Sequence, residues 1–392
     1  MARILLVSSY FRPHVGGVEV VVEHQAAILA AAGHQVTVAT TGASPSLPAH
    51  ERSGPHDGPS YDVVRLPAVN LLEERTGIPY PMVGPAFWRG LRELVRWSDA
   101  VHVHDVLYQP SQVAAVFAHR EGRPVDLTQH VGLVEHDSRL VLGAQRGVTA
   151  VAGRYVWRRA RQIFAYNPVV YEHLRSSGVA ADRIVLTGNG VDIAAFSPGT
   201  PRDEPGLRRQ LALPERRPIV LFVGRLVPKK GYRELIAAAA ADFHLVLVGP
   251  GRPPAQLPAG VSCVGEVPRS ELVELYRLAD VFVLPSVGEM TTLAMQEAMA
   301  CGLPVVTTED PRYDRYGVDR ELLSLVPAEP AALRQAIRTI LGDPGLRARM
   351  GAYSRRLAVQ RFDGAAHRQA LLRLYDADRT DVPVAAYQLQ AR

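Results

Sequence analysis

A cluster of cationic side chains follows an apolar segment near the middle of the sequence. Arg225 comes directly after Gly224, and Lys229 and Lys230 follow in the same loop, beyond an expected strand at 219–223. Arginine offers a planar fork of donors and lysine a compact point charge, and together they suit a diphosphate. Open parallel sheets bind ligands beyond the carboxyl ends of their strands, so this position favours a binding site. A solvated basic loop is the alternative.

Two carboxylates form the second candidate. Glu289 and Glu297 are separated by seven residues, on either side of the expected start of a helix at 293–301. Glu289 would precede this helix and Glu297 would lie about one turn inside it, so both could reach hydroxyl groups of one ligand. Backbone N–H groups at the helix start, where the helix dipole favours anions, would come from Met290, Thr291 and Thr292. The alternative is a carboxylate that stabilises the helix N-terminus together with a surface glutamate.

A pair of glycines forms the third candidate. Gly16 and Gly17 lie between an expected strand at 4–7 and an expected helix at 18–32. Glycine lets backbone N–H groups approach an anion closely, and the N-terminus of a helix attracts anions. A tight turn that requires glycine is the alternative.

Three histidines also lie in or directly after expected strands. His102 and His104 share one face of a strand, and Asp105 follows them, as in half of a metal site. Further ligands are not evident, so no metal is predicted. His130 follows the expected strand 125–129 and would lie at its carboxyl end, either as a hydrogen-bond donor to a ligand or as an ordinary loop residue.

Other catalytic patterns are not found in the sequence. It has no Walker A loop and no Gly-x-Ser-x-Gly elbow, and neither Cys263 nor Cys301 has a clear partner for a nucleophilic role. The arginines and aromatic residues of 154–161 could contact lipid headgroups, although a solvated helix face explains them as well.

The composition limits the class of protein. The chain has 392 residues, 47% of them hydrophobic and 21% charged, which is typical of a soluble protein with two or three domains. The net charge of +5 weakly favours anionic partners, but the basic residues form no long run, so nucleic acid is not expected. Two distant cysteines predict a reducing, cytoplasmic location. No segment approaches the roughly 20 apolar residues of a membrane span, so any membrane contact would be peripheral.

The expected elements alternate between strands and helices in two series. After the strand at 4–7, the first series has strands at 36–39, 63–66, 100–104, 125–129, 162–165 and 184–186. The second has strands at 219–223, 245–248, 262–264, 281–284 and 304–307, with helices at 233–241, 271–279, 293–301, 331–341 and 344–361. We interpret 198–205 as the linker, and 42–61 and 70–85 as loops. The pattern predicts two doubly wound α/β domains with parallel sheets, which would form a cleft if they faced each other.

Taken together and in this order, these segments resemble the retaining glycosyltransferases of family 4, and the resemblance extends over nearly the whole chain. It is carried by the Gly16-Gly17 loop and by four further stretches. These are Asn189-Gly190-Val191-Asp192, Val223–Leu226 with Lys229-Lys230-Gly231, Ala279–Ser286, and Glu289–Glu297 followed by Ala298–Val306.

The resemblance implies a fold and an activity. The fold would be GT-B, with two Rossmann-like domains facing each other across a cleft. We expect an acceptor domain at 1–198, a nucleotide-sugar domain at 199–363, and a helix and tail at 364–392 that return to the first domain. The enzyme would move a hexosyl group from a nucleotide-diphosphate sugar to a hydroxyl of a polysaccharide, lipid or small natural product, with retained configuration. Neither a metal nor a cofactor would be needed.

The resemblance also assigns roles to residues. Arg225 and Lys230 would hold the diphosphate, Glu289 the hydroxyls of the donor sugar, and Glu297 the ribose. Gly16 and Gly17 would approach the phosphates or the reacting sugar, and His130 would lie near that sugar. The remaining donor-site residues would be Val267, beside the base, and Met290, Thr291, Thr292 and Leu293.

One motif departs from the family. Where its members usually have Glu-Gly-Phe-Gly, this chain has Glu289-Met290-Thr291-Thr292, which narrows the approach of a ligand to the backbone and adds hydroxyls. Two other functions stay open. The first is a GT-B sugar-nucleotide epimerase or hydrolase, and the second is a protein that binds a nucleotide sugar without catalysis.

Overall fold

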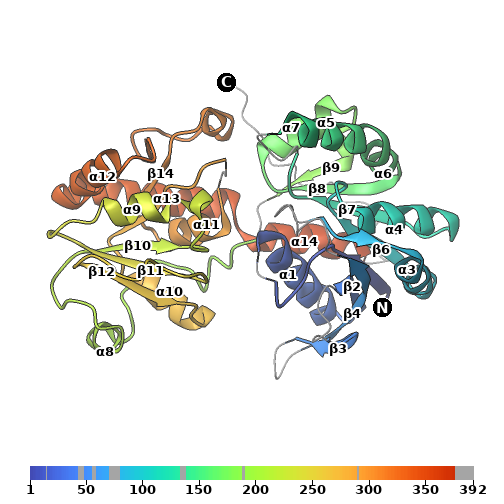
Figure 1. Ribbon diagram of the computed structural model, residues 1–392, viewed down its shortest axis with the longest axis horizontal. Coiled ribbons are helices and arrows are strands. Elements are labelled where there is room, and N and C mark those ends of the chain that lie inside the picture. The colour runs from blue at the N-terminus through green and yellow to red at the C-terminus, as the bar shows by residue number, and fades with distance from the viewer. Residues whose placement is uncertain are drawn as a thin grey trace. The chain divides into compact units, whose positions relative to one another are not determined.

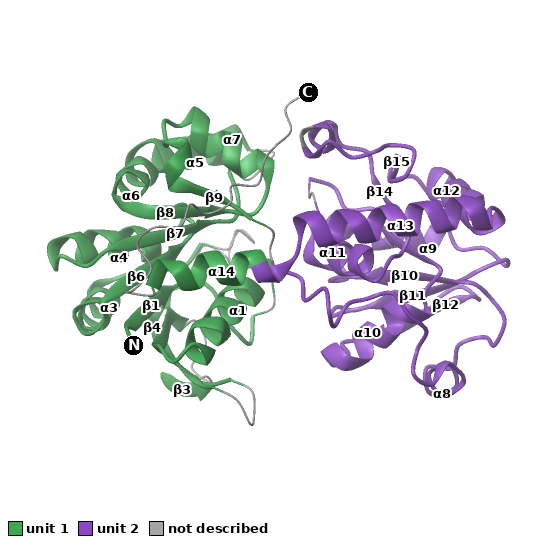
Figure 2. Ribbon diagram, turned by 180° about the vertical axis from the view of Figure 1, so that it is seen from behind, with its two compact units in different colours: residues 1–187, 366–392 green, residues 188–365 purple. Residues whose placement is uncertain are grey.

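The computed structural model describes residues 1–14, 16–42, 48–54, 59–69, 80–132, 138–187, 190–288 and 291–375. The chain divides into two compact units, which Figure 2 shows in different colours. Unit 1 combines residues 1–187 with 366–392, and unit 2 comprises residues 188–365. Each unit has its own sheet and its own hydrophobic core.

The sheet of unit 1 is mainly parallel. In the described part of the chain it has nine strands in the order β3-β4-β2-β1-β6-β7-β8-β9, with β5 paired to β4 (Figure 1). The strands are β1 (Arg3–Val7), β2 (Gln35–Gly42), β3 (His50–Ser53), β4 (Tyr61–Val69), β5 (Met82–Val83), β6 (Ala100–His104), β7 (Val125–Gln129), β8 (Ala160–Ala165) and β9 (Ile184–Leu186). Only β3 and β5 run antiparallel to their neighbour among these strands.

Helices cover both faces of this sheet. They are α1 (Gly17–Ala31), α3 (Pro85–Trp97), α4 (Gln109–Arg120), α5 (Arg139–Val148), α6 (Arg154–Arg159), α7 (Pro168–Ser176) and α14 (Gly364–Tyr375). Successive side chains of a strand point to opposite faces. Accordingly, Leu5 and Val7 of β1 pack with α3 and α4, whereas Ile4 and Leu6 pack with α1 and α14. Helix α14 therefore belongs to the core of unit 1, although it follows unit 2 in the sequence.

The sheet of unit 2 is parallel throughout its described strands. Their order is β12-β11-β10-β13-β14-β15, formed by β10 (Ile219–Val223), β11 (His244–Val248), β12 (Val261–Gly265), β13 (Val281–Leu284), β14 (Val305–Thr308) and β15 (Ser324–Val326). The helices are α8 (Glu204–Gln210), α9 (Tyr232–Ala237), α10 (Arg269–Leu278), α11 (Leu293–Ala300), α12 (Pro330–Gly342) and α13 (Pro344–Arg361). The four central strands β11, β10, β13 and β14 are almost fully buried, as expected for a parallel sheet with helices on both faces, whereas the edge strands β12 and β15 are partly exposed.

Both sheets have a topological switch point, where the chain changes the direction in which it adds strands. The switch lies between β1 and β6 in unit 1 and between β10 and β13 in unit 2. Open α/β sheets bind ligands at this point, beyond the carboxyl ends of the strands. Segments 8–14, 16–17 and 105–108 flank the switch of unit 1, and segments 224–231, 285–288 and 291–292 flank that of unit 2.

The structure confirms the predicted doubly wound α/β class and corrects three local predictions. An unbroken loop over 70–85 is wrong, because Met82–Val83 pairs with β4 as the short strand β5. An unbroken loop over 42–61 is also wrong, because His50–Ser53 pairs with β4 as the edge strand β3. Its sequence has no apolar alternation, so no strand pattern was visible. The predicted linker is irregular only to Asp203, whose carboxylate accepts the Gly206 N–H (2.9 Å) and caps α8.

None of the helices in the described ranges is long and apolar enough to cross a membrane.

Candidate functional site

The loop with the predicted phosphate-binding cations leaves β10 at the switch point of unit 2. The Gly224 N–H donates to the Val248 carbonyl (2.9 Å), and the Leu226 N–H donates to the Pro250 carbonyl (2.8 Å). These bonds tie the loop to the segment that follows β11. Arg225 lies between the two anchored residues and is exposed. Its backbone is thus fixed, while its guanidinium can reach a ligand.

A close backbone contact joins this loop to the next one. Gly231 has φ 67°, in the left-handed region that favours glycine. A Cβ on Gly231 would lie 2.2 Å from the Pro285 carbonyl oxygen. The Val287 N–H donates to the Lys229 carbonyl (3.0 Å). Lys230, which is half-buried, therefore lies where the loops after β10 and β13 meet.

The segment after β13 leads directly into α11. The Thr292 hydroxyl accepts the Met295 N–H (3.3 Å) and caps the helix. The Gln296 amide donates to the Thr291 carbonyl (2.7 Å), and Leu293 packs against the unit 2 core as the first residue of the helix. The extra hydroxyl that departs from the family motif at Thr292 thus has a structural role at the helix start.

Glu297 is a buried carboxyl group on α11, 5% exposed. The Tyr276 hydroxyl on α10 donates to Oε2 of Glu297 (3.1 Å). Burial raises the pKa of Glu297 to about 7, while the charge of Arg269 and the Tyr276 hydrogen bond act in the opposite direction. The helix therefore holds a carboxyl group whose charged form would gain from further hydrogen-bond donors, such as ligand hydroxyls.

Val267 lies just beyond the carboxyl end of β12. It is half-buried and packs against the unit 2 core. The Gly249 N–H after β11 donates to the Gly265 carbonyl at the end of β12 (2.8 Å). The loops after β10, β11 and β12 are therefore connected by backbone hydrogen bonds along one edge of the sheet.

In unit 1, the two predicted glycines begin α1. Gly16 is the N-cap, with extended backbone, and Gly17 is the first helical residue. A Cβ on Gly16 would lie 2.4 Å from Oε2 of Glu19. The other carboxylate oxygen of Glu19, Oε1, lies 2.5 Å from Nδ1 of His14. A Cβ on Gly17 would meet no described atom within 4 Å. Packing within the described part of unit 1 therefore does not account for a glycine at position 17.

His130 follows β7 and is held by two residues at the end of the neighbouring strand β6. Oδ1 of Asp105 accepts the backbone N–H groups of His130 (2.9 Å) and Val131 (3.3 Å). Nδ1 of His104 lies 3.1 Å from Nε2 of His130. Burial lowers the pKa of His130 to about 3 and raises the pKa of Asp105 to about 7.

The predicted site residues fall into two groups. Gly16, Gly17 and His130 belong to unit 1, at the carboxyl ends of β1 and β7. The remaining described ones belong to unit 2, and they are Arg225, Lys230, Val267, Thr291, Thr292, Leu293 and Glu297. Glu289 and Met290 lie outside the described residues. Within the described ranges, no group of three or more histidines, cysteines, aspartates or glutamates could hold a metal ion.

Sequence reasoning missed the residues that hold these groups in place. Asp105 has φ 58°, a left-handed conformation uncommon for a residue other than glycine, and this was not visible in the sequence. The partners Tyr276 and Glu297 are 21 positions apart. One usable signal was present: His104 and His130 end two expected strands, so adjacent strands would bring them to one edge.

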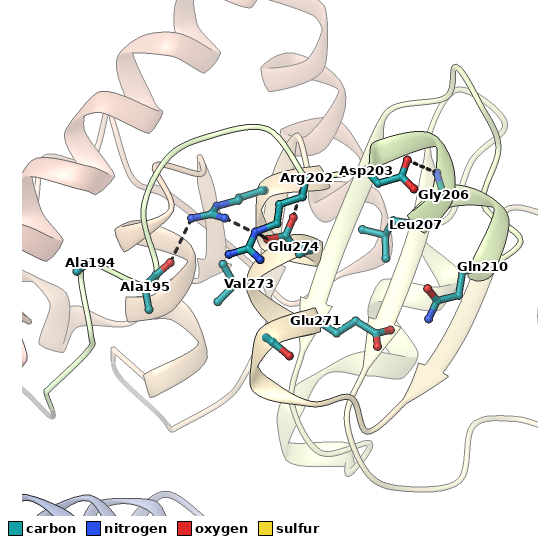
Figure 3. A pocket seen from close by; sticks show the side chains of 12 residues that line it. Ala194, Ala195, Arg202, Asp203, Gly206, Leu207, Gln210, Glu271, Val273 and Glu274 are labelled. Atoms are coloured by element: carbon teal, nitrogen blue, oxygen red, sulfur yellow. Dashed lines mark hydrogen bonds and ion pairs between the residues drawn. The ribbon is translucent and has the colours of Figure 1, made fainter. Parts of the chain in front are cut away.

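A separate pocket lies between α8 and α10 of unit 2, with a volume of about 720 Å³ (Figure 3). None of the predicted site residues lines it. Glu274 in its wall accepts the Arg202 N–H (2.7 Å) and pairs with Arg277 (3.1 Å), which also donates to the Ala195 carbonyl (3.4 Å). These contacts fasten the segment before α8 to α10, which is a structural role.

The comparisons with known proteins agree on one family. The model described as Glycosyltransferase Family 4 matches residues 15–195, and the model described as Glycosyl transferases group 1 matches residues 203–357. A D-inositol 3-phosphate glycosyltransferase of Acidothermus cellulolyticus is 32% identical over 378 residues, which cover 86% of this chain and 80% of that protein. A GDP-mannose-dependent alpha-mannosyltransferase of Mycolicibacterium smegmatis is 30% identical, over 92% of this chain and 93% of that protein.

Solved structures extend this likeness to the fold. Sucrose-phosphate synthase from Thermosynechococcus elongatus matches with a TM-score of 0.71 at 24% identity, over 96% of this chain and 98% of that chain. The predicted GT-B fold is therefore confirmed.

The contact between Gly231 and Pro285 yields a stability prediction. We expect Gly231→Ala to lower the free energy of unfolding by more than Gly260→Ala does. Both residues have positive φ, a strain of roughly 1–3 kcal/mol for alanine. Only Gly231 would also place its Cβ against a backbone oxygen, since the nearest atom to a Cβ on Gly260 is 3.6 Å away. Urea unfolding of both variants measures the difference, and equal losses would contradict the contact.

The buried carboxyl group yields a pH prediction. Because the pKa of Glu297 is raised to about 7 in the folded state, that state binds the proton more tightly than the unfolded chain. The Glu297 contribution to stability therefore falls as pH rises from about 4.5 to about 7 and stays low above that range. Glu297→Gln should gain stability relative to wild type over this interval. Urea midpoints measure it, with exposed Glu266→Gln as the control. If the difference in urea midpoint between Glu297→Gln and wild type did not change with pH, the raised pKa of Glu297 would be contradicted.

Proposed function

Because the chain belongs to glycosyltransferase family 4, we propose that it moves a hexosyl group from a nucleotide-diphosphate sugar to an acceptor hydroxyl with retention of the anomeric configuration. The observation that carries the proposal is the junction of the loops after β10 and β13. In this junction the backbone of Lys229 and Gly231 meets that of Val287 and Pro285, which supports a site that joins Arg225 and Lys230 of one loop to Glu289 and Glu297 beyond the other. Cations and carboxylates at one switch point suit a ligand that has both phosphates and hydroxyls.

The two cations act on the leaving group in this proposal. When the bond between the anomeric carbon and the phosphate oxygen breaks, negative charge develops on the nucleoside diphosphate. Arg225 and Lys230 would stabilise that charge because they are positioned before the reaction. They would also supply the charge compensation that a divalent cation supplies in other phosphate sites.

The sugar and acceptor complete the reaction. The anomeric centre becomes oxocarbenium-like, and the acceptor oxygen attacks from the face that the diphosphate leaves. The leaving phosphate oxygen takes the acceptor proton, so no protein nucleophile is needed. We assign Glu297 to the ribose hydroxyls and Glu289 to the hydroxyls of the sugar.

The remaining site residues are assigned by their elements. Val267 would lie beside the base, and Met290, Thr291, Thr292 and Leu293 would present backbone groups to the donor. Gly16 and Gly17 would approach the phosphates or the reacting sugar through the N-terminus of α1, and His130 would contact that sugar. We assign 199–363 to the donor and 1–198, together with the returning segment 364–392, to the acceptor.

The names of the relatives suggest the first substrates to test. One relative is described as dependent on GDP-mannose and another as acting on D-inositol 3-phosphate. We therefore propose GDP-mannose and D-inositol 3-phosphate as the reference donor and acceptor, within panels that vary the base, the sugar and the acceptor.

A donor panel tests the proposed reaction. We expect one nucleotide sugar to raise the melting temperature, since a ligand of the native state stabilises it. With a suitable hydroxyl acceptor, the same donor should give a product whose anomeric configuration is retained in the proton NMR spectrum. Turnover of the donor at the same rate with and without every acceptor would indicate an epimerase or hydrolase. Binding without turnover would indicate a binding protein, and inversion would contradict the mechanism.

Charge removal at the loop after β10 tests the two cations. We expect Arg225→Ala and Lys230→Ala each to lower kcat by about 10²–10³-fold, the loss typical of one missing donor to developing charge. The matched control is Arg216→Ala, an exposed arginine that precedes β10 at the opposite end of the same strand. The melting temperature without ligand should not change. Wild-type turnover in both variants would overturn the assignment.

A further inference from the structure

Three imidazole rings form a row beneath the carboxyl edge of the unit 1 sheet. The ring centroids of His102 and His104 are 5.2 Å apart, and those of His104 and His130 are 5.4 Å apart, with interplanar angles of 28° and 25°. His102 uses both ring nitrogens, towards the Tyr375 hydroxyl (2.8 Å) and the Thr128 hydroxyl (2.7 Å). The row is therefore fixed at its inner end by α14 and β7.

His104 joins this row to His130 through a nitrogen–nitrogen contact of 3.1 Å. Burial lowers the pKa of His130 to about 3 and, as the largest cause, holds the pKa of His104 well below its usual range. Both rings are therefore neutral at neutral pH, and each carries one N–H. A hydrogen bond between them needs a single proton, on Nδ1 of His104 or on Nε2 of His130.

The other nitrogen of His104 decides between these two arrangements. Nε2 of His104 is buried and has no hydrogen-bond partner among the described residues. If Nε2 of His130 donated the hydrogen bond, Nδ1 of His104 would accept it, and the one ring proton of His104 would be on Nε2. That N–H would be buried without an acceptor. Buried unpaired N–H groups are rarer than under-used acceptors. The proton therefore belongs on Nδ1 of His104, which donates to Nε2 of His130.

The next residue fixes the backbone to which the His130 ring is attached. Asp105 accepts the N–H groups of His130 and Val131, and it also accepts the side-chain amide of Gln129 (3.0 Å). The Ser111 hydroxyl donates to the His104 carbonyl (2.7 Å). Two adjacent residues at the end of β6 thus hold the main chain and the ring of His130.

We propose that His104 is a positioning residue that holds His130 as the tautomer with its proton on Nδ1. His130 then presents an N–H to the reacting sugar and acts as a hydrogen-bond donor, not as a base. When Nε2 of His130 accepts a hydrogen bond from a fixed donor, it cannot carry the ring proton, so that proton must be on Nδ1. The contact of His130 with a sugar rests on the proposed function, but the tautomer itself does not.

Nuclear magnetic resonance of the full-length protein with ¹⁵N-labelled histidine tests the tautomer without any substrate. The His130 signals are assigned by their loss in His130→Gln. We expect Nδ1 to be protonated in the wild type. The exposed control His119→Leu should leave this pattern unchanged. A wild-type His130 with its proton on Nε2 would overturn the proposal, whether or not any His104 variant folds.

Two variants of His104 test the positioning. Leucine cannot donate, whereas the asparagine amide can supply an N–H close to the position of the imidazole Nδ1. In His104→Leu we expect His130 to populate both ring tautomers and kcat to fall by about tenfold. The KM for the donor should stay within about twofold of the wild-type value. His104→Asn should keep the wild-type tautomer and restore kcat to within about threefold. An unchanged tautomer or kcat in folded His104→Leu would overturn the proposal.

The two proposals fail separately. If no donor is turned over while His130 still shows its proton on Nδ1, the proposed function fails and the tautomer stands. If transfer is observed while His130 carries its proton on Nε2, the proposed function stands and the role of His104 fails.

Discussion

The close approach of two backbone segments at the switch point of unit 2 is the constraint on which the candidate donor site depends. Gly231 lies so near the Pro285 carbonyl that only a residue without a Cβ fits, and the Val287 N–H bonds to the Lys229 carbonyl in the same junction. Parallel strands bring their carboxyl ends to one edge, but this contact sets the distance between the two loops. The backbone of Lys230 is thereby held beside the segment after β13.

Burial shapes the chemistry of one candidate residue in each unit, Glu297 in unit 2 and His130 in unit 1. The Glu297 carboxyl group on α11 is buried and the His130 ring after β7 is partly buried, and each is held by a partner on a neighbouring element. Burial pushes both groups towards their neutral forms, which raises the pKa of Glu297 and lowers the pKa of His130. Such groups gain from a ligand that supplies further hydrogen bonds to them.

Much of the fold could be predicted because buried parallel strands are short apolar segments, as in β10 and β13, and helix ends carry glycine or capping residues. The edge strand β3 could not, because its His50–Ser53 sequence has no apolar alternation. The cation loop was visible from residue types and position. The contacts of His104 and Tyr276 were not, because their partners are 26 and 21 positions away and only the sheet order and helix packing bring them together.

The most direct test of the central claim is a crystal structure of the protein with a bound nucleoside diphosphate. The account predicts that phosphate oxygens lie within hydrogen-bond distance of Arg225 and Lys230, with the ribose hydroxyls on Glu297. A nucleotide bound elsewhere, for example in the pocket between α8 and α10, would contradict it. The loop after β10 would then be a solvated basic turn, and the family's donor site would have moved in this chain.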